Sequence, residues 1–278
     1  MKKFWKNANF RLKAGIAITA FFVFLGFVVY YIPHVDPFTY NTYRGKLPPS
    51  LKHPLGTTSM GQDVFWLLIE AIHNSLLIGF IVATIGTVVG VFVGLLSGFS
   101  GGFVDRVLMV ITDTFVVVPS LPILVLMTSL MKGSTTIILM ALVLGVFAWA
   151  WPSRQIRSLA LSLKERDFIH TAWFSGEGTI QVVVTEILPY ALTWSLSNFM
   201  NATLAAIASE SSLAVLGLSP ANLISLGNMI QWARERNAIF TGQWFWIGPP
   251  IVATVLLFIG LFLLITGYND YLSMKRGR

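Results

Sequence analysis

The sequence has no cysteine and few charged residues. The absence of cysteine excludes disulfide bonds, thiol catalysis and cysteine-ligated metal sites. Charged residues make up 11% of the 278 positions, whereas soluble proteins average about 25%. The few histidines do not have metal-ligand spacing, and no nucleophile–base arrangement is evident; they are His34, His53, His73 and His170. We therefore expect no catalytic residue, no metal site and no bound cofactor in this chain.

A phosphate-binding loop is also missing. No Gly-x-x-x-x-Gly-Lys-Ser/Thr pattern occurs, so we do not expect the chain to hydrolyse ATP itself. The net charge of +7 does not point to nucleic acid, because the basic residues flank apolar runs and form no separate basic domain.

Long apolar runs dominate the remaining sequence, which is 55% hydrophobic. A membrane-spanning helix needs roughly 20 apolar residues. Stretches without acidic or basic residues cover positions 14–35, 71–104, 114–131, 133–153, 187–209 and 238–269. The sequence predicts an all-α polytopic membrane protein. Its six transmembrane helices are expected at residues 14–32, 74–96, 107–130, 136–151, 189–209 and 245–268.

The distribution of basic residues predicts the orientation. With six spans, all but six of the 19 lysines and arginines fall on the cytoplasmic side, as the positive-inside rule requires. The six external ones are Arg44, Lys46, Lys52, Lys132, Arg234 and Arg236. We expect both termini to be cytoplasmic: residues 1–13 form the N-terminus, 14–33 the first span, which is retained, and 34–72 an external segment of loop or short interfacial helices. Residues 73–278 form the core, with a cytoplasmic loop at 152–188.

Glycines and prolines indicate how the helices pack. Gly86, Gly90 and Gly94 form a small-residue ridge that allows close approach of another helix, the alternative being glycines that face lipid. Pro119 and Pro122 are expected to bend the third span. Residues 131–135 are expected to form a short outer loop, and the broken apolar stretch 211–233 outer or re-entrant structure.

Residues 151–192 form the longest charged, amphipathic interval. Ile156, Leu159, Ala160 and Leu163 have the spacing of one helix face, and a second periodic set is Ile180, Val183, Val184 and Ile187. Gly176 and Gly178 allow a sharp turn between them. We expect a helix, a short helix, a turn and a further helix before a new span begins at Pro189. Periodicity alone leaves two interpretations open: a docking site for a separate motor protein, or an amphipathic loop on the lipid surface.

This interval resembles the EAA loop of the permeases of binding-protein-dependent ABC importers. Ala172, Gly176 and Leu188-Pro189 match its pattern in register, whereas His170 and Thr171 stand where the usual Glu and first Ala would be. Further blocks resemble the second, or "C", permease of the dipeptide/oligopeptide/nickel family over residues 50–278. These blocks are His53-Pro54-Leu55-Gly56-Thr57, Gly61-Gln62-Asp63-Val64, Ser75-Leu76-Leu77-x-Gly79, Gly98 to Arg106 with Asp113 and Pro119, and Glu210 with Leu213 and Leu216-Gly217-Leu218.

The resemblance implies a type I ABC importer permease fold and a set of partners. The chain would form half of a heterodimeric pore with a second homologous permease in the plasma membrane. Two ATP-binding subunits, carrying ATP and Mg²⁺, would dock on the EAA loops, and an external binding protein would deliver the substrate. The residues expected to couple to the ATPase are Arg166, Asp167, Phe168, His170, Thr171, Ala172, Gly176, Leu188 and Pro189.

Some of these residues carry a specific expectation. Phe168 would anchor in a groove of the ATPase, the alternative being packing under the chain's own helices. The small residues Ala172 and Gly176 would allow close approach of the backbone.

The candidate gate and pore residues are Asp113, Glu210, Ser211, Leu216, Gly217 and Pro220. Acidic groups near a membrane core usually face a partner or the protein interior. We expect Asp113 to form an interfacial or intersubunit pair. Glu210 is expected to shape the outer gate, the alternative being a solvated helix end.

The substrate stays open between oligosaccharides, oligopeptides and nickel. An aromatic outer face tilts the choice slightly towards oligosaccharides, because sugar rings stack on such side chains. An ordinary interfacial aromatic belt is nevertheless the favoured explanation of these residues, which are Trp232, Phe240, Trp244, Phe245 and Trp246. The different classes that remain are an ion-coupled secondary transporter and, less favoured, a membrane enzyme. Neither internal repeats nor a chain of intramembrane charges supports the former.

Overall fold

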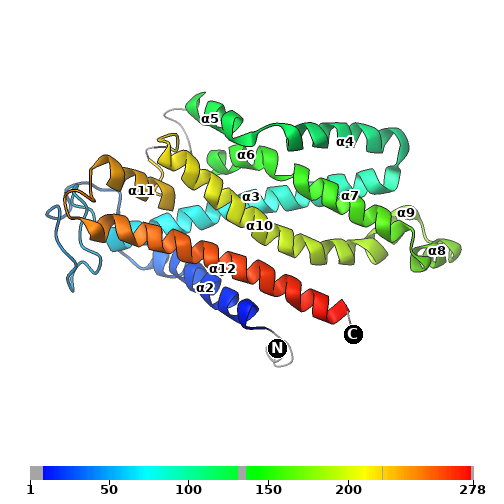
Figure 1. Ribbon diagram of the computed structural model, residues 1–278, viewed down its shortest axis with the longest axis horizontal. Coiled ribbons are helices and arrows are strands. Elements are labelled where there is room, and N and C mark those ends of the chain that lie inside the picture. Colours follow the sequence, from blue (N-terminus) through cyan, green and yellow to red (C-terminus); the bar gives the residue numbers. More distant parts are fainter. Residues whose placement is uncertain (1–8, 131–135, 221, 277–278) are drawn as a thin grey trace.

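The computed structural model describes residues 9–130, 136–220 and 222–276 and is built from helices (Figure 1). The predicted outer loop at 131–135, with Lys132, lies outside the described residues. The helices are α2 (Phe10–Phe27), α3 (Val64–Ser100), α4 (Gly102–Val117), α5 (Ser120–Leu130), α6 (Ile137–Ala148), α7 (Ala150–Lys164), α8 (Asp167–Phe174), α9 (Thr179–Val182), α10 (Leu188–Val215), α11 (Leu226–Glu235) and α12 (Trp244–Arg276), with a 3-10 turn η1 (Val29–Tyr31) and a π-turn η2 (Val183–Ile187).

Each predicted span corresponds to one long helix or one bent pair of helices. The segments Phe10–Tyr31, Val64–Ser100 and Trp244–Met274 are individually long and apolar enough to cross a membrane. Two bent pairs, α4 with α5 and α6 with α7, are apolar enough to add a span each. The fifth predicted span, residues 189–209, corresponds to α10, which is long enough at 28 residues but is not among the segments apolar enough to cross a membrane by composition.

The third predicted span is sharply bent and divided into two helices. Its two halves, α4 and α5, meet at an angle of 81°. The break lies at Val118, whose backbone is extended and which precedes Pro119. Proline disfavours the helical conformation of the residue before it, so the helix ends there. The predicted bend at the prolines is therefore confirmed, and it is sharp enough to divide the span into two helices.

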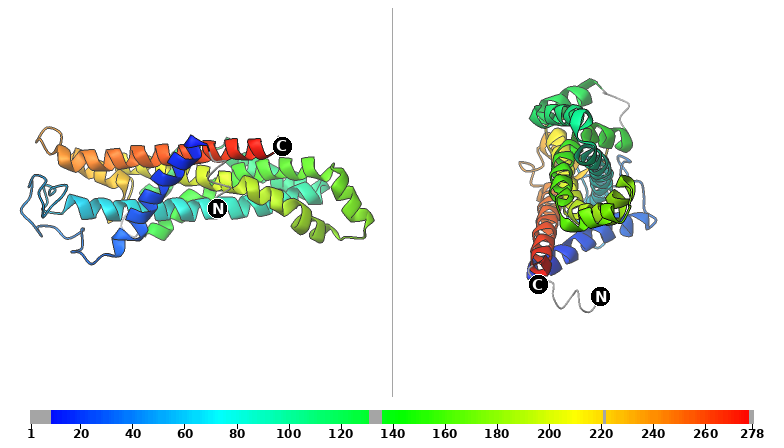
Figure 2. Two further views of the ribbon diagram at one scale, coloured as in Figure 1. Left: turned by 90° about the horizontal axis from the view of Figure 1, so that it is seen from below. Right: turned by 90° about the vertical axis from the view of Figure 1, so that its right-hand side faces the viewer.

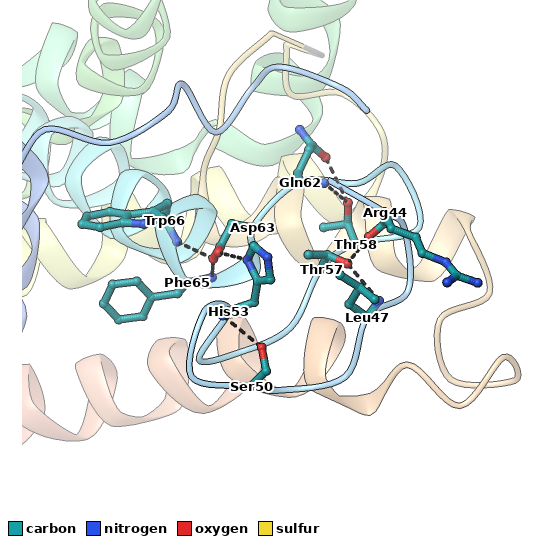
Figure 3. Close-up of polar contacts among 10 residues, drawn as sticks. All are labelled: Arg44, Leu47, Ser50, His53, Thr57, Thr58, Gln62, Asp63, Phe65 and Trp66. Atoms are coloured by element: carbon teal, nitrogen blue, oxygen red, sulfur yellow. Dashed lines mark hydrogen bonds and ion pairs between the residues drawn. The ribbon is translucent and has the colours of Figure 1, made fainter. Parts of the chain in front are cut away.

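The second span begins earlier than hydropathy predicts. α3 starts at Val64 instead of residue 74, because Asp63 caps it: the Asp63 carboxylate accepts hydrogen bonds from the backbone N–H groups of Phe65 and Trp66. The same carboxylate contacts His53 Nδ1 at 2.7 Å, so the cap also ties down the preceding loop (Figure 3).

The outer segment before α3 is an ordered loop held by side chains. Thr57 Oγ1 donates to the carbonyl of Arg44 and accepts from the N–H of Leu47, and Thr58 Oγ1 accepts from the N–H of Gln62 (Figure 3). The residues between η1 and α3 contain turns but no helix, so the interfacial helices considered for this segment are not formed.

α2 and α12 cross each other along one side of the molecule (Figure 2). Glycines permit the approach, since a Cβ atom at Gly15 would overlap the backbone of Leu264, and one at Gly267 the backbone of Leu12. Near this crossing, Asn9 Nδ2 donates to Asp270 Oδ2 at 3.1 Å. The beginning of α2 and the end of α12 therefore lie at the same end of the bundle.

Candidate functional site

The segment from α7 to η2, residues 150–187, forms an arm at the end of the molecule opposite α11 (Figure 1). The predicted apolar face of α7 is confirmed: Ile156, Ala160 and Leu163 are buried and Leu159 is partly buried. These side chains pack against Leu95 of α3 and neighbouring residues. Because the chain's own helices cover this face, it is not free to lie on lipid, and the lipid-surface interpretation is wrong for α7.

The glycine ridge of α3 holds the arm to the bundle. A Cβ atom at Gly94 would lie 2.7 Å from Ile156 Cβ, and one at Gly98 would lie 2.8 Å from Ala160 Cβ. A Cβ at Gly90 would overlap Pro152 in the same way. Gly90, Gly94 and Gly98 are four residues apart, and so are the α7 residues that they contact, Pro152, Ile156 and Ala160. The ridge therefore faces protein rather than lipid, as predicted.

An ion pair joins α7 to α4. Arg157 donates from Nε and Nη2 to the two carboxylate oxygens of Asp105, at 2.6 and 2.7 Å. Ser97 Oγ also donates to Asp105, which brings α3 into the contact. A two-pronged pair of this kind fixes geometry as well as supplying energy. Asp105 lies in one of the sequence blocks that resemble the family, but no pattern in the sequence predicts its pairing with Arg157.

The predicted order of a helix, a short helix, a turn and a further helix is confirmed along the arm. α8 ends in a Schellman motif, in which the N–H of Gly176 donates to the carbonyl of Trp173 and the N–H of Glu177 to that of Ala172. The motif requires a left-handed residue, and Gly176 supplies it with φ of +85°. The second turn glycine, Gly178, is extended with φ of −71° and has no such requirement.

The predicted coupling residues divide into exposed and covered sets. Ala172 is buried against the arm's own hydrophobic cluster, and Phe168 and Leu188 are partly buried there. The smallness of Ala172 therefore serves internal packing. The exposed set consists of Arg166, Asp167, His170, Thr171, Gly176 and Pro189.

Phe168 takes the alternative arrangement that the sequence left open. Its ring stacks on Tyr190 of α10, with the centroids 6.0 Å apart, and it packs against the buried cluster. The exposed aromatic ring of α8 is instead Phe174, which is 91% exposed. Phe174 is the last residue of α8, immediately before the predicted turn. That position is the feature of the sequence from which its exposure could have been predicted, because a short helix cannot cover an aromatic side chain at its own end.

The second periodic set of the arm was predicted only in part. Ile187 is buried and Val183 partly buried, but Ile180 and Val184 are exposed. The π-turn explains this shift, since the N–H of Leu188 donates to the carbonyl of Val183, five residues back, and the inward positions no longer follow a 3.6-residue period. The new helix predicted to begin at Pro189 is continuous with η2.

Phe174, Ile180 and Val184 consequently form an exposed apolar set on the two sides of the Gly176 turn; we call it the arm tip. The charged residues Arg166 and Asp167 are exposed at the beginning of α8. Exposed aromatic side chains such as Phe174 are enriched in protein-binding surfaces.

The candidate gate residue Glu210 is fully buried, so it is not a solvated helix end. Its Oε1 atom accepts hydrogen bonds from Ser225 Oγ at 2.7 Å and Ser219 Oγ at 3.3 Å. Asn228 joins the same cluster by donating from Nδ2 to Ser219 Oγ and to the carbonyls of Pro220 and Leu223. Together these bonds tie residues 219, 220, 223 and 225, which lie between α10 and α11, to Glu210 and Asn228.

α3 also holds this folded segment. Asn74 Nδ2 donates to the carbonyl of Ile224, and Ser75 Oγ accepts from the N–H of Leu226. Both side chains are buried. Of the stretch 211–233, predicted as outer or re-entrant structure, residues 216–220 and 222–225 are irregular, whereas α10 extends to Val215 and α11 occupies residues 226–233.

The other candidate gate residues lie along the same turn. Ser211 is partly buried, and the Cβ that Gly227 lacks would lie 2.7 Å from Ser211 Cα. Leu216 is 65% exposed and Gly217 has φ of +76°, which marks the end of α10.

Asp113 is separate from this cluster. Its Oδ1 atom lies 3.3 Å from Arg154 Nε, with both side chains about half exposed. The pair lies within this chain, between α4 and α7, and is weaker than the Asp105–Arg157 pair because exposed ion pairs contribute roughly 0–1 kcal/mol. Within the described residues, no group of three or more histidines and acidic residues could hold a metal ion.

Comparison with known proteins agrees with this architecture. Residues 86–278 match the family described as "Binding-protein-dependent transport system inner membrane component". The chain is 32% identical over 252 residues to the oligopeptide transport system permease protein OppC of Mycobacterium bovis, covering 89% of this chain and 86% of that protein. It is 31% identical over 233 residues to OppC of Bacillus subtilis, covering 81% and 75% respectively.

A nickel transporter subunit is also similar. The nickel transport system permease protein NikC of Escherichia coli K12 is 27% identical over 264 residues, covering 92% of each chain. The family match over residues 86–278 includes the arm, the glycine ridge and Glu210 with its partners Ser219, Ser225 and Asn228. The chain therefore belongs to the binding-protein-dependent ABC transporter permeases of the oligopeptide and nickel type.

Proposed function

We propose that this chain is one of two pore-forming permeases of an ATP-driven oligopeptide importer. A second homologous permease completes the pore, two ATP-binding subunits hold ATP and Mg²⁺, and an external binding protein delivers the peptide. The arm lies on the cytoplasmic side together with both termini. The observation that carries this proposal is the arm tip, an exposed apolar surface on an arm that is fastened to α3 and α4.

The construction of the arm suits the transmission of force. α7 is fastened to α3 by the glycine ridge and to α4 by Arg157, while η2 continues without a break into α10. A load applied at the arm tip therefore reaches three membrane helices through rigid contacts. Tight packing transmits displacement because interiors have low compressibility.

Oligopeptides fit better than oligosaccharides as the substrate. The case for sugars rested on five outer aromatic residues, of which Trp246 is buried and Trp232 and Phe245 are partly buried. Only Phe240 and Trp244 of that set are exposed. Because the chain belongs to a binding-protein-dependent transport family, an ABC importer is favoured over the ion-coupled secondary transporter. Nickel remains the second candidate, because the similarity to NikC extends over 92% of both chains.

The arm tip can be tested with two phenylalanines at opposite ends of the molecule. Phe174 is 91% exposed at the arm tip, and Phe240 is 89% exposed near α11. We expect Phe174→Ser to lose the ATP-binding subunits during purification from native membranes, because the apolar centre of the interface is removed. The matched variant Phe240→Ser should retain them. Equal retention of these subunits by both variants would contradict the proposal.

A further inference from the structure

α10 carries amide side chains in the middle of a membrane-spanning helix. Asn198 and Asn201 lie about one turn apart, so they occupy the same face of the helix. Asn201 is exposed and Asn198 partly exposed. An amide that faces hydrocarbon without hydrogen-bond partners costs several kcal/mol. This face of α10 is therefore expected to meet water or substrate rather than lipid.

Two cavities meet at these asparagines. One has a volume of about 540 Å³ and lies between α10 and helices α5, α6 and α7. The other, of about 480 Å³, lies between α10 and the last turns of α12. Three residues line both cavities, namely Trp194, Asn198 and Asn201. The two amides thus stand at the junction of two spaces that are each large enough for several amino-acid residues.

The amides have unused hydrogen-bonding capacity. Asn198 Nδ2 donates to Thr87 Oγ1 at 3.3 Å, and Asn201 Nδ2 donates to the carbonyl of Ser197 at 3.0 Å. Within the described chain, neither amide oxygen accepts a hydrogen bond. Each amide retains a free acceptor and a second N–H donor. This donor–acceptor pair is complementary to the N–H and C=O of a peptide bond.

The described residues that line both cavities are uncharged. Gln155 and Ser209 add further polar groups to the larger cavity, and Asn269 and Ser273 to the smaller one. A neutral lining imposes no charge preference on the side chains of a peptide. It also gives a divalent cation no carboxylate to offset its desolvation, which is costly within a membrane protein.

We propose that Asn198 and Asn201 form a subsite that hydrogen-bonds the backbone of an oligopeptide at the junction of these cavities. The proposal rests on the proposed function and specifies where this chain contacts its substrate. Backbone recognition at this point allows peptides of different sequence to pass, because every peptide bond offers the same two groups.

The absence of cysteine makes a direct test possible. A single introduced cysteine is the only thiol of this chain. Asn201→Cys is placed on the cavity face, and Leu196→Cys is the matched control on α10. Leu196 is 45% exposed and lies five positions away, on the far side of the helix. Membrane vesicles containing the complete transporter and its external binding protein are treated with a charged, membrane-impermeant thiol reagent, with or without penta-alanine or Ni²⁺.

We expect Asn201→Cys to react from at least one side of the membrane, and Leu196→Cys to react only with a lipid-soluble maleimide. Penta-alanine should slow the reaction of Asn201→Cys several-fold, whereas Ni²⁺ should not change it. An unreactive Asn201→Cys, or a rate that is the same with and without penta-alanine, would overturn the subsite. Because labelling needs no ATP, these results are separate from the association with ATP-binding subunits on which the proposed function depends.

Discussion

At the scale of single residues, Gly176 and Gly178 occupy one turn but have different backbone conformations. Gly176 is left-handed, with φ of +85°, and Gly178 is extended, with φ of −71°. An added Cβ atom would meet nothing within 4 Å at either position. A side chain therefore creates backbone strain at Gly176 alone.

We predict that Gly176→Val abolishes most ATP-dependent uptake and that Gly178→Val retains it. Valine in the left-handed region costs roughly 1–2 kcal/mol, which is enough to open the Schellman motif at the end of α8 and misplace the arm tip. Uptake by vesicles, normalised to the amount of chain in the membrane, measures the effect. Similar uptake by the two variants would show that the turn geometry does not matter for coupling.

Single residues also show where the periodicity of apolar residues predicts burial and where it does not. Ile156, Ala160 and Leu163 were predicted correctly as one buried face, because α7 is regular. Ile180 and Val184 were misplaced, because a π-turn shifts the inward positions and no pattern in a single sequence signals it. Phe168 and Phe174 are both aromatic residues of α8, and only the tertiary packing on Tyr190 distinguishes them.

At the scale of elements, α4 is attached to the arm by two ion pairs of unequal quality. In the Asp105–Arg157 pair the side chains are 18% and 32% exposed and the contact is two-pronged. In the Asp113–Arg154 pair the side chains are 52% and 49% exposed and 3.3 Å apart. The first pair is therefore expected to hold α4 to α7, and the second to contribute little.

We predict that Arg157→Gln lowers the free energy of unfolding by about 1–2 kcal/mol, because Asp105 loses a charged partner in a partly desolvated site. Arg154→Gln should change it by less than about 1 kcal/mol. Thermal unfolding of the purified transporter in detergent gives the comparison. The charge-reversed double variant Asp105→Arg with Arg157→Asp should recover part of the loss. A larger effect at Arg154 would reverse the assignment of the two pairs.

The helices and their packing could be predicted from the sequence where long apolar runs and rows of glycine determine them. The glycine ridge of α3 predicted close packing, and its partners are α6 at Gly86 and α7 at Gly90 and Gly94. The position of the bend between α4 and α5 could be predicted from Pro119, but its angle of 81° could not, because the sequence does not give the angle between two helices. The start of α3 at Val64 was missed because the cap by Asp63 is a polar signal outside the apolar run.

At the scale of the whole molecule, the two ends have different constructions. At one end, α11 and the loop before α3 are held by buried hydrogen bonds and the Asp63 cap. The arm lies at the other end (Figure 1), and the apolar side chains of its tip are exposed. Between them, α10 connects the Glu210 cluster, the two cavities and the arm in one continuous helix. This connection is the physical route by which an event at the arm tip could reach the cavities and the opposite end.

The most direct test of this account is peptide uptake by liposomes that contain the purified transporter. We predict uptake of labelled peptide only when ATP, the external binding protein and both permeases are present. We further predict that Phe174→Ser loses this uptake while Phe240→Ser retains a substantial part of it. Peptide uptake by this chain alone without ATP, or undiminished uptake by the Phe174→Ser variant, would contradict the claim that the arm tip couples ATP hydrolysis to transport.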